Sequence, residues 1–366
     1  MKTRIGSSRQ TPASGDTLIA AAQDSRPLSA TDVAPAFTVL NVRTDSPATR
    51  LHDRVLARLD FTGNTPTSRN DPRHIPVGLR SLDDGEWSEL WLSNRPVRCG
   101  EEHGIAFAEN GEVLFGSVFL GDEQIRDLRR ATLRIYVLID SCLHRWGYPH
   151  WLRAWHFLAR ITDGDGEQER YRRFNAGRRR AIELHGELHR DLPAATAIGT
   201  HSSGLSICFL AGKRPITQVE NPRQISAFNY PAEYGAHSPA FSRAALYRSA
   251  PNASLFVSGT ASIVGHATRH RGDAIEQTRE ALRNVNALLE HATERHFDGQ
   301  RSLLGLAHKI YVRHPEDWPA IREVLSQSLQ SSQPVLPLHA DICRRDLLVE
   351  IEGVYGLASP SVSFDQ

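Results

Sequence analysis

Near its end the chain reads Leu336-Pro-Leu-His-Ala-Asp-Ile-Cys-Arg-Arg-Asp-Leu-Leu-Val-Glu-Ile-Glu-Gly-Val-Tyr355. From Leu347 onward, apolar and polar residues alternate with the two-residue period of a β-strand. This period places Glu350 and Glu352 on one face and the apolar side chains on the other. Cys343 precedes the strand in a loop. The stretch is therefore either an acid site with a thiol at its mouth or a half-buried antiparallel strand that shows its polar face to water.

Size and composition place the chain among ordinary globular proteins. Its 366 residues suffice for two domains, and the apolar and charged fractions are 40% and 23%. The formal net charge is +1, so no overall field favours nucleic acid or a membrane surface as a partner. We expect neither.

The termini and cysteines indicate a cytoplasmic protein. Residues 1–32 are rich in Ser, Thr, Ala, Asp and Pro, which predicts a mobile leader without the apolar core of a signal peptide. No run of about 18 apolar residues predicts a membrane span. The cysteines form no CxxC pair, which favours reduced thiols. They are Cys99, Cys142, Cys208 and Cys343.

The chain predicts the same order of elements twice. Strands are expected at 36–42, 54–61 and 87–92, then a hairpin at 104–120, helices at about 122–146 and 167–188, and strands at 151–161 and 205–210. Later come a strand at 255–264, helices at about 273–291 and 317–329, and a strand at 303–312. Both halves read hairpin, helix, strand, helix, strand. We predict two α+β domains, 33–213 and 214–366, each with a mixed sheet and helices packed on one face. The closing strand of the first domain contains no acid, so any acid chemistry belongs to the second.

Several common catalytic patterns are absent or weak. No GxSxG, GxGxxG or phosphate loop occurs. His266 and His270 are flanked by glycines and are interpreted as loop residues rather than metal ligands. The arginine-rich helix at 167–188 also contains glutamates, so we expect a solvated, self-paired helix rather than a nucleic-acid surface.

Residues 221–247 form a long, aromatic, proline-interrupted loop, a kind of segment that often binds a ligand. Arginine recognises carboxylates through two parallel hydrogen bonds, and tyrosines add donors and apolar walls. The candidate binding residues are Arg223, Gln224, Tyr230, Tyr234 and Arg243. The alternative is that this loop only covers a sheet edge.

The stretch 334–341 with Leu347-Leu-Val-Glu-Ile-Glu352 resembles the C-terminal signature of the Rid/YjgF family, and Leu255-Phe-Val-Ser-Gly-Thr260 matches an earlier block. Small Rid proteins hydrolyse imines with an arginine just before the last strand, where this chain has Val335. The doubled length, residues 221–231 and the spacing from Cys343 to Glu350 instead resemble the chorismatases, two-domain relatives that split chorismate into pyruvate and a ring acid.

The resemblance implies two Rid/YjgF-like, chorismate-mutase-like α+β units with Glu350 as the catalytic acid. It implies that Cys343 marks the members that form 3-hydroxybenzoate, and Gly259 fits the same group. Chorismate has two carboxylates, and we assign Arg243 with Tyr230 to one of them. Tyr234 and Gln224 are assigned to the same pocket.

For the second carboxylate, Arg223, Lys309 and Arg313 are candidates. No metal or organic cofactor is implied. We expect a monomer, with a trimer as the alternative. The competing functions are a hydrolytic chorismatase, a bifunctional 3-/4-hydroxybenzoate synthase, an imine deaminase and a ligand-binding protein.

Overall fold

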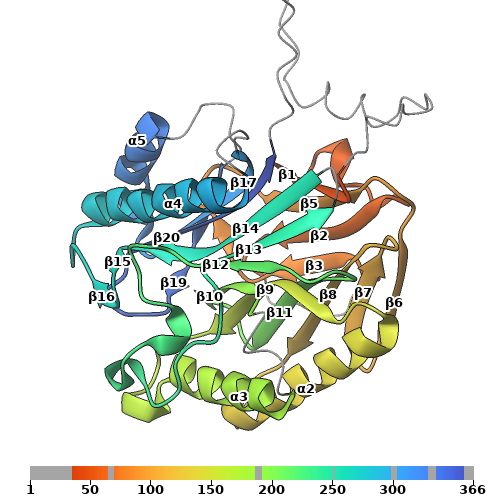
Figure 1. Cartoon of the computed structure of the whole chain (residues 1–366), viewed down its shortest axis with the longest axis horizontal. Helices are drawn as coiled ribbons and strands as arrows, with labels where there is room; N and C mark the ends of the chain where they lie inside the picture. The colour runs from red at the N-terminus through yellow and green to blue at the C-terminus, as the bar shows by residue number, and fades with distance from the viewer. Residues whose placement is uncertain are drawn as a thin grey trace, which may run out of the picture. The chain divides into compact units, whose positions relative to one another are not determined.

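The computed structural model describes residues 35–64, 70–185, 192–249, 252–297, 303–328 and 335–357. The leader predicted at residues 1–32 lies outside these ranges. Within them, the chain forms two seven-stranded sheets, a four-stranded sheet and a two-stranded hairpin. Helices α2 and α3 pack on one large sheet and α4 and α5 on the other (Figure 1). The expected α+β class, with mixed sheets and helices on one face, is confirmed.

Residues 35–212 contain the four strands of the small sheet and all strands of the first large sheet except its edge strand near residue 341. The strands are β1 (Phe37–Arg43), β2 (Val55–Phe61), β3 (His74–Val77), β4 (Arg80–Ser81), β5 (Trp87–Ser93), β6 (Arg98–Glu102), β7 (Ile105–Glu109), β8 (Val113–Leu120), β9 (His150–Ala159), β10 (Ala194–Thr200) and β11 (Leu205–Gly212). The helices are η1 (Pro47–Thr49), α2 (Leu128–Trp146), η2 (Gly166–Gln168) and α3 (Arg170–His185).

Residues 217–357 contain most of the second large sheet. The strands are β12 (Thr217–Val219), β13 (Ala244–Ser249), β14 (Asn252–Ala261), β15 (Ile263–Val264), β16 (Ala267–Thr268), β17 (Leu303–Val312), β18 (Val335–His339), β19 (Asp341–Ile342) and β20 (Val349–Leu357). The helices are η3 (Ala227–Asn229), η4 (Ala232–Tyr234), α4 (Ala274–His296), η5 (Pro315–Asp317) and α5 (Trp318–Ser328).

The two large sheets repeat one strand order. The first sheet runs β19-β10-β9-β11-β8-β7-β6, and the second runs β4-β18-β17-β20-β14-β13-β12. Each contains one parallel pair at the equivalent place, β9 with β10 and β17 with β18. This agrees with duplication of one unit. Each sheet also takes an edge strand from the other half of the chain, because β19 pairs with β10 and β4 with β18. The domain boundary near residue 213 stays a prediction.

Helix ends follow local capping. Helix α2 begins at Leu128 rather than at 122, because Asp127 caps it by accepting a hydrogen bond from the Arg130 N–H at 3.2 Å. It ends where Gly147 adopts a left-handed conformation with φ 82°. Helix α4 extends to His296, beyond the predicted end at 291.

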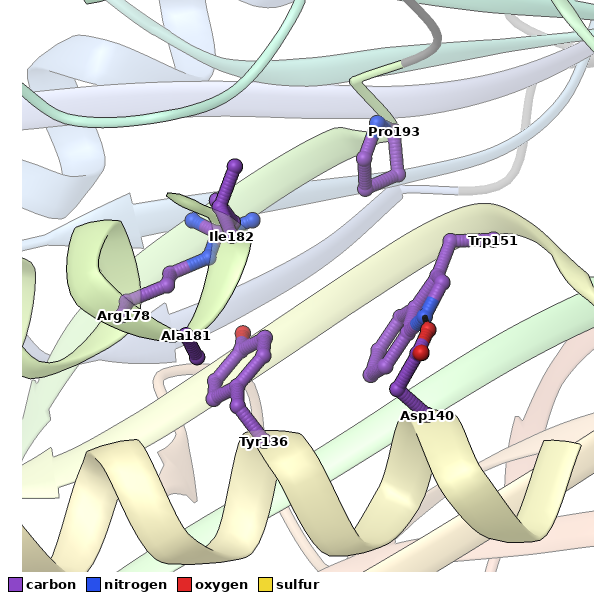
Figure 2. A pocket seen from close by; sticks show the side chains of 7 residues that line it. All are labelled: Tyr136, Asp140, Trp151, Arg178, Ala181, Ile182 and Pro193. Carbon is purple, nitrogen blue, oxygen red and sulfur yellow. Dashed lines mark hydrogen bonds between the residues drawn. The ribbon is translucent and has the colours of Figure 1, made fainter. Parts of the chain in front are cut away.

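Helix α3 is self-paired only in part, because Arg173 pairs with Asp127 outside the helix and Arg170 donates to the Ala159 carbonyl. Glu183 pairs with Arg179 and Arg180. Arg178 differs: it is buried, and its guanidinium lies over the Tyr136 ring. Both border a cavity of about 10 Å³ between α2 and α3 (Figure 2). That volume holds about one water molecule, so the cavity is not a site for an organic ligand.

One core joins the inner faces of both large sheets and the small sheet. Trp91 of β5 lies 5.6 Å from Trp155 of β9 and 6.4 Å from Phe256 of β14, measured between ring centroids. The inner face of β20 therefore faces protein. Glu350 and Glu352 are only 4% and 3% exposed, so the interpretation of β20 as a strand with its polar face in water is wrong.

Candidate active site

A cavity of about 340 Å³ opens beside the inner face of β20. This volume suits a small organic ligand. Its lining comes from both halves of the chain, since α3 and the preceding turn add residues to those of the loop at 230–243 and of β14, β15 and β20. The lining residues are Glu169, Tyr171, Arg172, Tyr230, Glu233, Tyr234, Pro239, Phe241, Arg243, Gly259, Ala261, Ile263, Cys343, Arg344, Arg345, Asp346 and Glu350.

Glu350 is the buried acid of this cavity. It lies on β20, between β14 and β17, opposite Ala261 on one side and Tyr311 on the other. Burial raises the pKa of the Glu350 carboxyl to about 8, and the negative charge of Glu352 adds to the effect. A carboxyl group with this pKa carries its proton at neutral pH. Glu350 can therefore act as a general acid.

Gly259 makes room for that carboxyl group. The pairing of β14 with β20 shifts register between Val257 and Thr260, and Gly259 lies within the shift. A Cβ atom on Gly259 would lie 1.9 Å from Glu350 Oε1. No other residue type fits here unless the glutamate moves. The strand predicted at 255–264 thus contains a β-bulge at Gly259 that shapes the site.

Glu352 lies on the same face of β20 but is ionised. Its carboxylate accepts hydrogen bonds from Arg153 at 2.7 Å and Trp155 at 2.9 Å, and Lys309 Nζ lies 3.0 Å away. Burial alone would raise the pKa of Glu352, but Lys309 and Arg153 outweigh it and hold the pKa below its ordinary value. Lys309 also donates to Glu89 at 2.6 Å. The structure therefore separates the two carboxyl groups by their surroundings.

Cys343 follows β19 and lines the cavity near Glu350. Burial raises the pKa of its thiol to about 12, and the charge of Glu350 contributes. The thiol form is therefore the stable one at neutral pH, which does not suit a nucleophile. None of the cysteines is in a disulfide, as the sequence predicted.

Arg243 and Tyr230 meet as the sequence predicted. An Nη atom of Arg243 donates to the Tyr230 hydroxyl at 2.8 Å and to the Ile225 carbonyl at 2.7 Å. Arg243 is 4% exposed, and its Nε–H is buried without a hydrogen-bond partner in the part of the chain that the structure describes. A buried, unpaired guanidinium N–H in a cavity wall can bind an anion.

Arg344 is a cavity residue that the sequence analysis missed. Its guanidinium lies 3.9 Å from the Tyr234 ring centroid and 5.1 Å from that of Tyr230. One Nη atom donates to the His266 carbonyl at 2.9 Å, and the other is buried with no hydrogen-bond partner within the described ranges. The one feature of the sequence that could have indicated Arg344 as a cavity residue is its position directly after Cys343.

Gln224 is not among the lining residues. Its amide donates to the Ile263 carbonyl at 3.0 Å, and so supports the segment that leads into the β15–β16 hairpin. That Gln224 binds the substrate stays a prediction. Its position outside the cavity lining argues against this role. Tyr234, by contrast, borders the cavity, where its hydroxyl lies 3.3 Å from His266 Nδ1.

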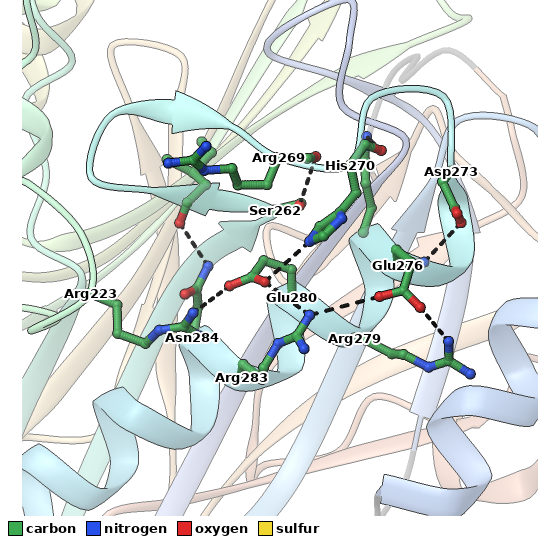
Figure 3. Close-up of polar contacts among 12 residues, drawn as sticks. Arg223, Ser262, Arg269, His270, Asp273, Glu276, Arg279, Glu280, Arg283 and Asn284 are labelled. Atoms are coloured by element: carbon green, nitrogen blue, oxygen red, sulfur yellow. Dashed lines mark hydrogen bonds and ion pairs between the residues drawn. The ribbon is translucent and has the colours of Figure 1, made fainter.

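The three residues predicted to bind the second substrate carboxylate do not line the cavity. Each pairs instead with an acidic side chain of the protein. Lys309 is paired with Glu89 and Glu352. Arg313 pairs with Asp341 at 2.6 Å. Figure 3 shows the third, Arg223, which bonds to Glu280 at 2.5 Å.

His270 joins the same cluster around Glu280, at 3.4 Å. It lies in a loop, as expected, and contacts a carboxylate rather than a metal-binding group. Among the described residues, no group of three or more His, Cys, Asp or Glu could hold a metal ion. None of the described helices is long and apolar enough to cross a membrane.

Known proteins resemble the chain over most of its length. Residues 89–211 match the family described as "Chorismatase FkbO/Hyg5-like, N-terminal". A protein named chorismatase from Streptomyces hygroscopicus is 37% identical over 322 residues, 85% of this chain and 92% of that protein. A 3-hydroxybenzoate synthase from the same species is 36% identical over 300 residues, 79% of this chain and 87% of that protein. A crystal structure of a chorismatase matches with a TM-score of 0.80 and 34% identity, covering 88% of this chain and 98% of the other.

Proposed function

The chain belongs to the chorismatase family, and on this premise we propose that it converts chorismate into 3-hydroxybenzoate and pyruvate. The observation that carries the proposal is the Glu350 carboxyl group, which is buried in a cavity large enough for a small organic acid and has a pKa raised to about 8. Splitting an enolpyruvyl ether requires a proton on carbon, and carbon is a weak base. A carboxyl group that stays protonated at neutral pH suits this step.

In the proposed first step, Glu350 transfers its proton to the methylene carbon of the enolpyruvyl group. The carbon–carbon double bond becomes a methyl group beside an oxocarbenium ion, and Glu350 becomes a carboxylate. That carboxylate lies near the new cation and stabilises it. Glu352 stays ionised throughout because Lys309 and Arg153 balance its charge.

In the second step, the ring hydroxyl attacks the cation and loses its proton, which closes a cyclic ketal. The bond from the ring carbon to that oxygen then breaks as the neighbouring ring C–H loses its proton, so that the ring becomes aromatic. Pyruvate leaves with that oxygen, and the former ether oxygen takes up the hydroxyl proton to become the phenol. The products together contain the atoms of chorismate, so no water is consumed. The proton lost on aromatisation balances the one that Glu350 donated. A water molecule attacking the same cation would instead give a dihydroxycyclohexadienoate, the product of the hydrolytic alternative.

We assign the two substrate carboxylates to Arg243 and Arg344. Both line the cavity, and each has a buried guanidinium N–H without a hydrogen-bond partner among the described residues. Their guanidinium carbons lie 5.4 and 5.1 Å from the Tyr230 ring centroid, so the two cations are close enough to hold one small dianion. Tyr230 and Tyr234 form the wall that keeps the arginines in place.

The proposed role of Cys343 is to select the product. Its neutral thiol occupies space beside Glu350, where water would otherwise reach the cation. The 36% identity with a 3-hydroxybenzoate synthase supports this subtype. Tyr171 and Arg172 of the first half complete the cavity wall, which supports a whole site within one chain.

The test is to incubate the purified protein with chorismate and to identify the ring product by chromatography while pyruvate is measured. Equal amounts of pyruvate and 3-hydroxybenzoate are expected. A non-aromatic diol would assign the chain to the hydrolytic subtype, and a mixture with 4-hydroxybenzoate to the bifunctional one. Absence of pyruvate would reject the activity and favour a ligand-binding protein. Turnover of 2-aminoacrylate-type imines would reveal a deaminase.

A further inference from the structure

Strand β10 of the first sheet crosses β14 of the second sheet at the Gly259 bulge. The Ala195 N–H donates to Ser258 Oγ at 2.8 Å, and the Gly259 N–H donates to Thr196 Oγ1 at 2.9 Å. Ser258 Oγ in turn donates to the Ser242 carbonyl at 2.6 Å. Two consecutive residues of β10 thus contact two consecutive residues of the bulge.

The Thr196 hydroxyl also contacts the ion pair beneath the site. It accepts a hydrogen bond from Arg153 Nη2 at 2.5 Å, and the same nitrogen lies 2.7 Å from Glu352 Oε2. Thr196, which is 3% exposed, thus accepts hydrogen bonds from groups of both halves, Arg153 of the first and Gly259 of the second. Its hydroxyl also helps to hold the pKa of Glu352 below the ordinary value.

We propose that Thr196 is a positioning residue for the reaction: its hydroxyl ties the Gly259 bulge to the Arg153–Glu352 ion pair and so holds open the space that the Glu350 carboxyl occupies. The inference rests on the proposed function of Glu350 as the acid. Glu350 Oε1 lies so close to Gly259 that a Cβ atom there would be 1.9 Å away. Any movement of the bulge therefore moves the carboxyl or closes its space.

The half of the chain that does not carry the proposed catalytic acid thus has a defined part in the chemistry. Thr196 on β10 and Arg153 on β9 belong to the first half, and they orient the acid of the second. Proton transfer to carbon depends on the distance and direction of the donor. A shift of the Glu350 carboxyl is expected to slow that step more than it weakens binding, because within the described ranges the hydrogen bonds of Arg243 and Arg344 do not involve Thr196.

The test compares Thr196→Val, which replaces the hydroxyl by a methyl group of similar shape, with Thr196→Ser, which keeps the hydroxyl. The control is Thr200→Val on the same strand. Thr200 is equally buried, but its hydroxyl bonds to the Ser202 carbonyl at 3.4 Å, away from the bulge. Steady-state pyruvate release from chorismate gives kcat and KM for each variant.

For Thr196→Val we expect kcat to fall roughly 10- to 100-fold with little change in KM. The pH above which activity falls stays the same as in the wild type. Lys309 still holds Glu352 ionised, and the charge of Glu352 keeps the pKa of Glu350 raised. Thr196→Ser and Thr200→Val stay near the wild type. If Thr196→Val does not fold, Thr196→Cys replaces it, and its weaker hydrogen-bonding group is expected to give a kcat clearly below that of Thr196→Ser.

Three results would overturn the inference: wild-type kcat in Thr196→Val, equal losses in the Val and Ser variants, or an equal loss in Thr200→Val. If Thr196→Cys has to replace Thr196→Val, a kcat equal to that of Thr196→Ser would also overturn the inference. A wild-type protein that releases no pyruvate would reject the proposed function instead, so the two failures are distinguishable.

Discussion

Glu350 and Glu352 point to the same side of β20, and the charge of the second raises the pKa of the first. Glu352 can hold that charge because Arg153 and Lys309 lie 2.7 and 3.0 Å from its oxygens. Glu350 has no such ion pair. The strand thus presents one carboxylic acid and one carboxylate to the same interior.

The first prediction concerns pH. Glu350 acts in its protonated form, and its pKa is raised to about 8. We therefore expect kcat/KM to be level at pH values well below 8 and to fall about tenfold per pH unit above that pKa. The pH profile of pyruvate release measures this. An activity that rises through the same range would mean that the ionised form is active and would exclude Glu350 as the acid.

The second prediction concerns Glu352→Gln. Loss of the carboxylate removes the charge that keeps the Glu350 proton in place and leaves Lys309 and Arg153 in excess. The pKa of Glu350 falls, so the alkaline limb of the profile moves to lower pH. Breaking a buried ion pair should also lower the free energy of unfolding by about 3–5 kcal/mol, which denaturant unfolding measures.

The matched control is Glu109→Gln. Glu109 is also buried and paired, with Arg98 and the Tyr148 hydroxyl both at 2.6 Å, but it does not line the cavity. This variant is expected to lose stability with its pH profile unchanged. A Glu352→Gln profile that coincides with the wild type would contradict the account.

The third prediction concerns the product. Cys343→Ala removes the sulfur beside Glu350 and opens space for water near the cation. We expect the ring product to shift from 3-hydroxybenzoate towards the dihydroxycyclohexadienoate, while pyruvate release continues. Cys142→Ala, which removes another buried thiol, is the control. Chromatography of the ring products decides, and identical profiles in both variants would remove the selecting role of Cys343.

The fourth prediction concerns binding. Arg243→Ala and Arg344→Ala each remove one proposed ligand of a substrate carboxylate. We expect KM to rise about 10- to 100-fold in each variant, because the substrate charge is left buried without its partner. Arg279→Ala is the control, since that arginine is exposed on α4 and pairs with Glu276. An unchanged KM in either cavity variant would assign that carboxylate to another residue.

Much of the fold could be predicted because its signals are local. The alternation in β20, the Asn110-Gly111 turn and the apolar period of α4 all lie within short windows. The edge strands β4 and β19 could not be predicted, since two residues show no period. Their exchange between sheets depends on pairing across the whole chain.

The site was predictable only in part. Glu350, Cys343, Arg243, Tyr230 and Gly259 do meet at one cavity. The pKa difference between the two glutamates could not be foreseen, because Arg153 lies 199 residues before Glu352 in the chain. Nothing in the local sequence marks such a partner.

The same distance explains the residues that were missed or misplaced. Arg344 directly follows Cys343, but its value as a ligand depends on two tyrosine rings contributed by a distant loop. Lys309 is a basic residue that the sequence offers for the second substrate carboxylate, yet its charge pairs with Glu89 and Glu352. Charge alone does not distinguish these two roles.

The most direct test of the account is turnover of chorismate by Glu350→Gln. The amide has the size of the acid but cannot donate the proton. It should fold at least as well as the wild type. In the wild type the pKa of Glu350 is higher in the folded protein than in the unfolded chain, so this carboxyl lowers the free energy of unfolding at any pH above its ordinary pKa. The glutamine variant is free of that cost. Titration with chorismate should still show binding, since Arg243 and Arg344 remain. We predict that pyruvate release falls to background while binding and folding persist. Wild-type turnover in Glu350→Gln would contradict the central claim that this carboxyl group supplies the proton.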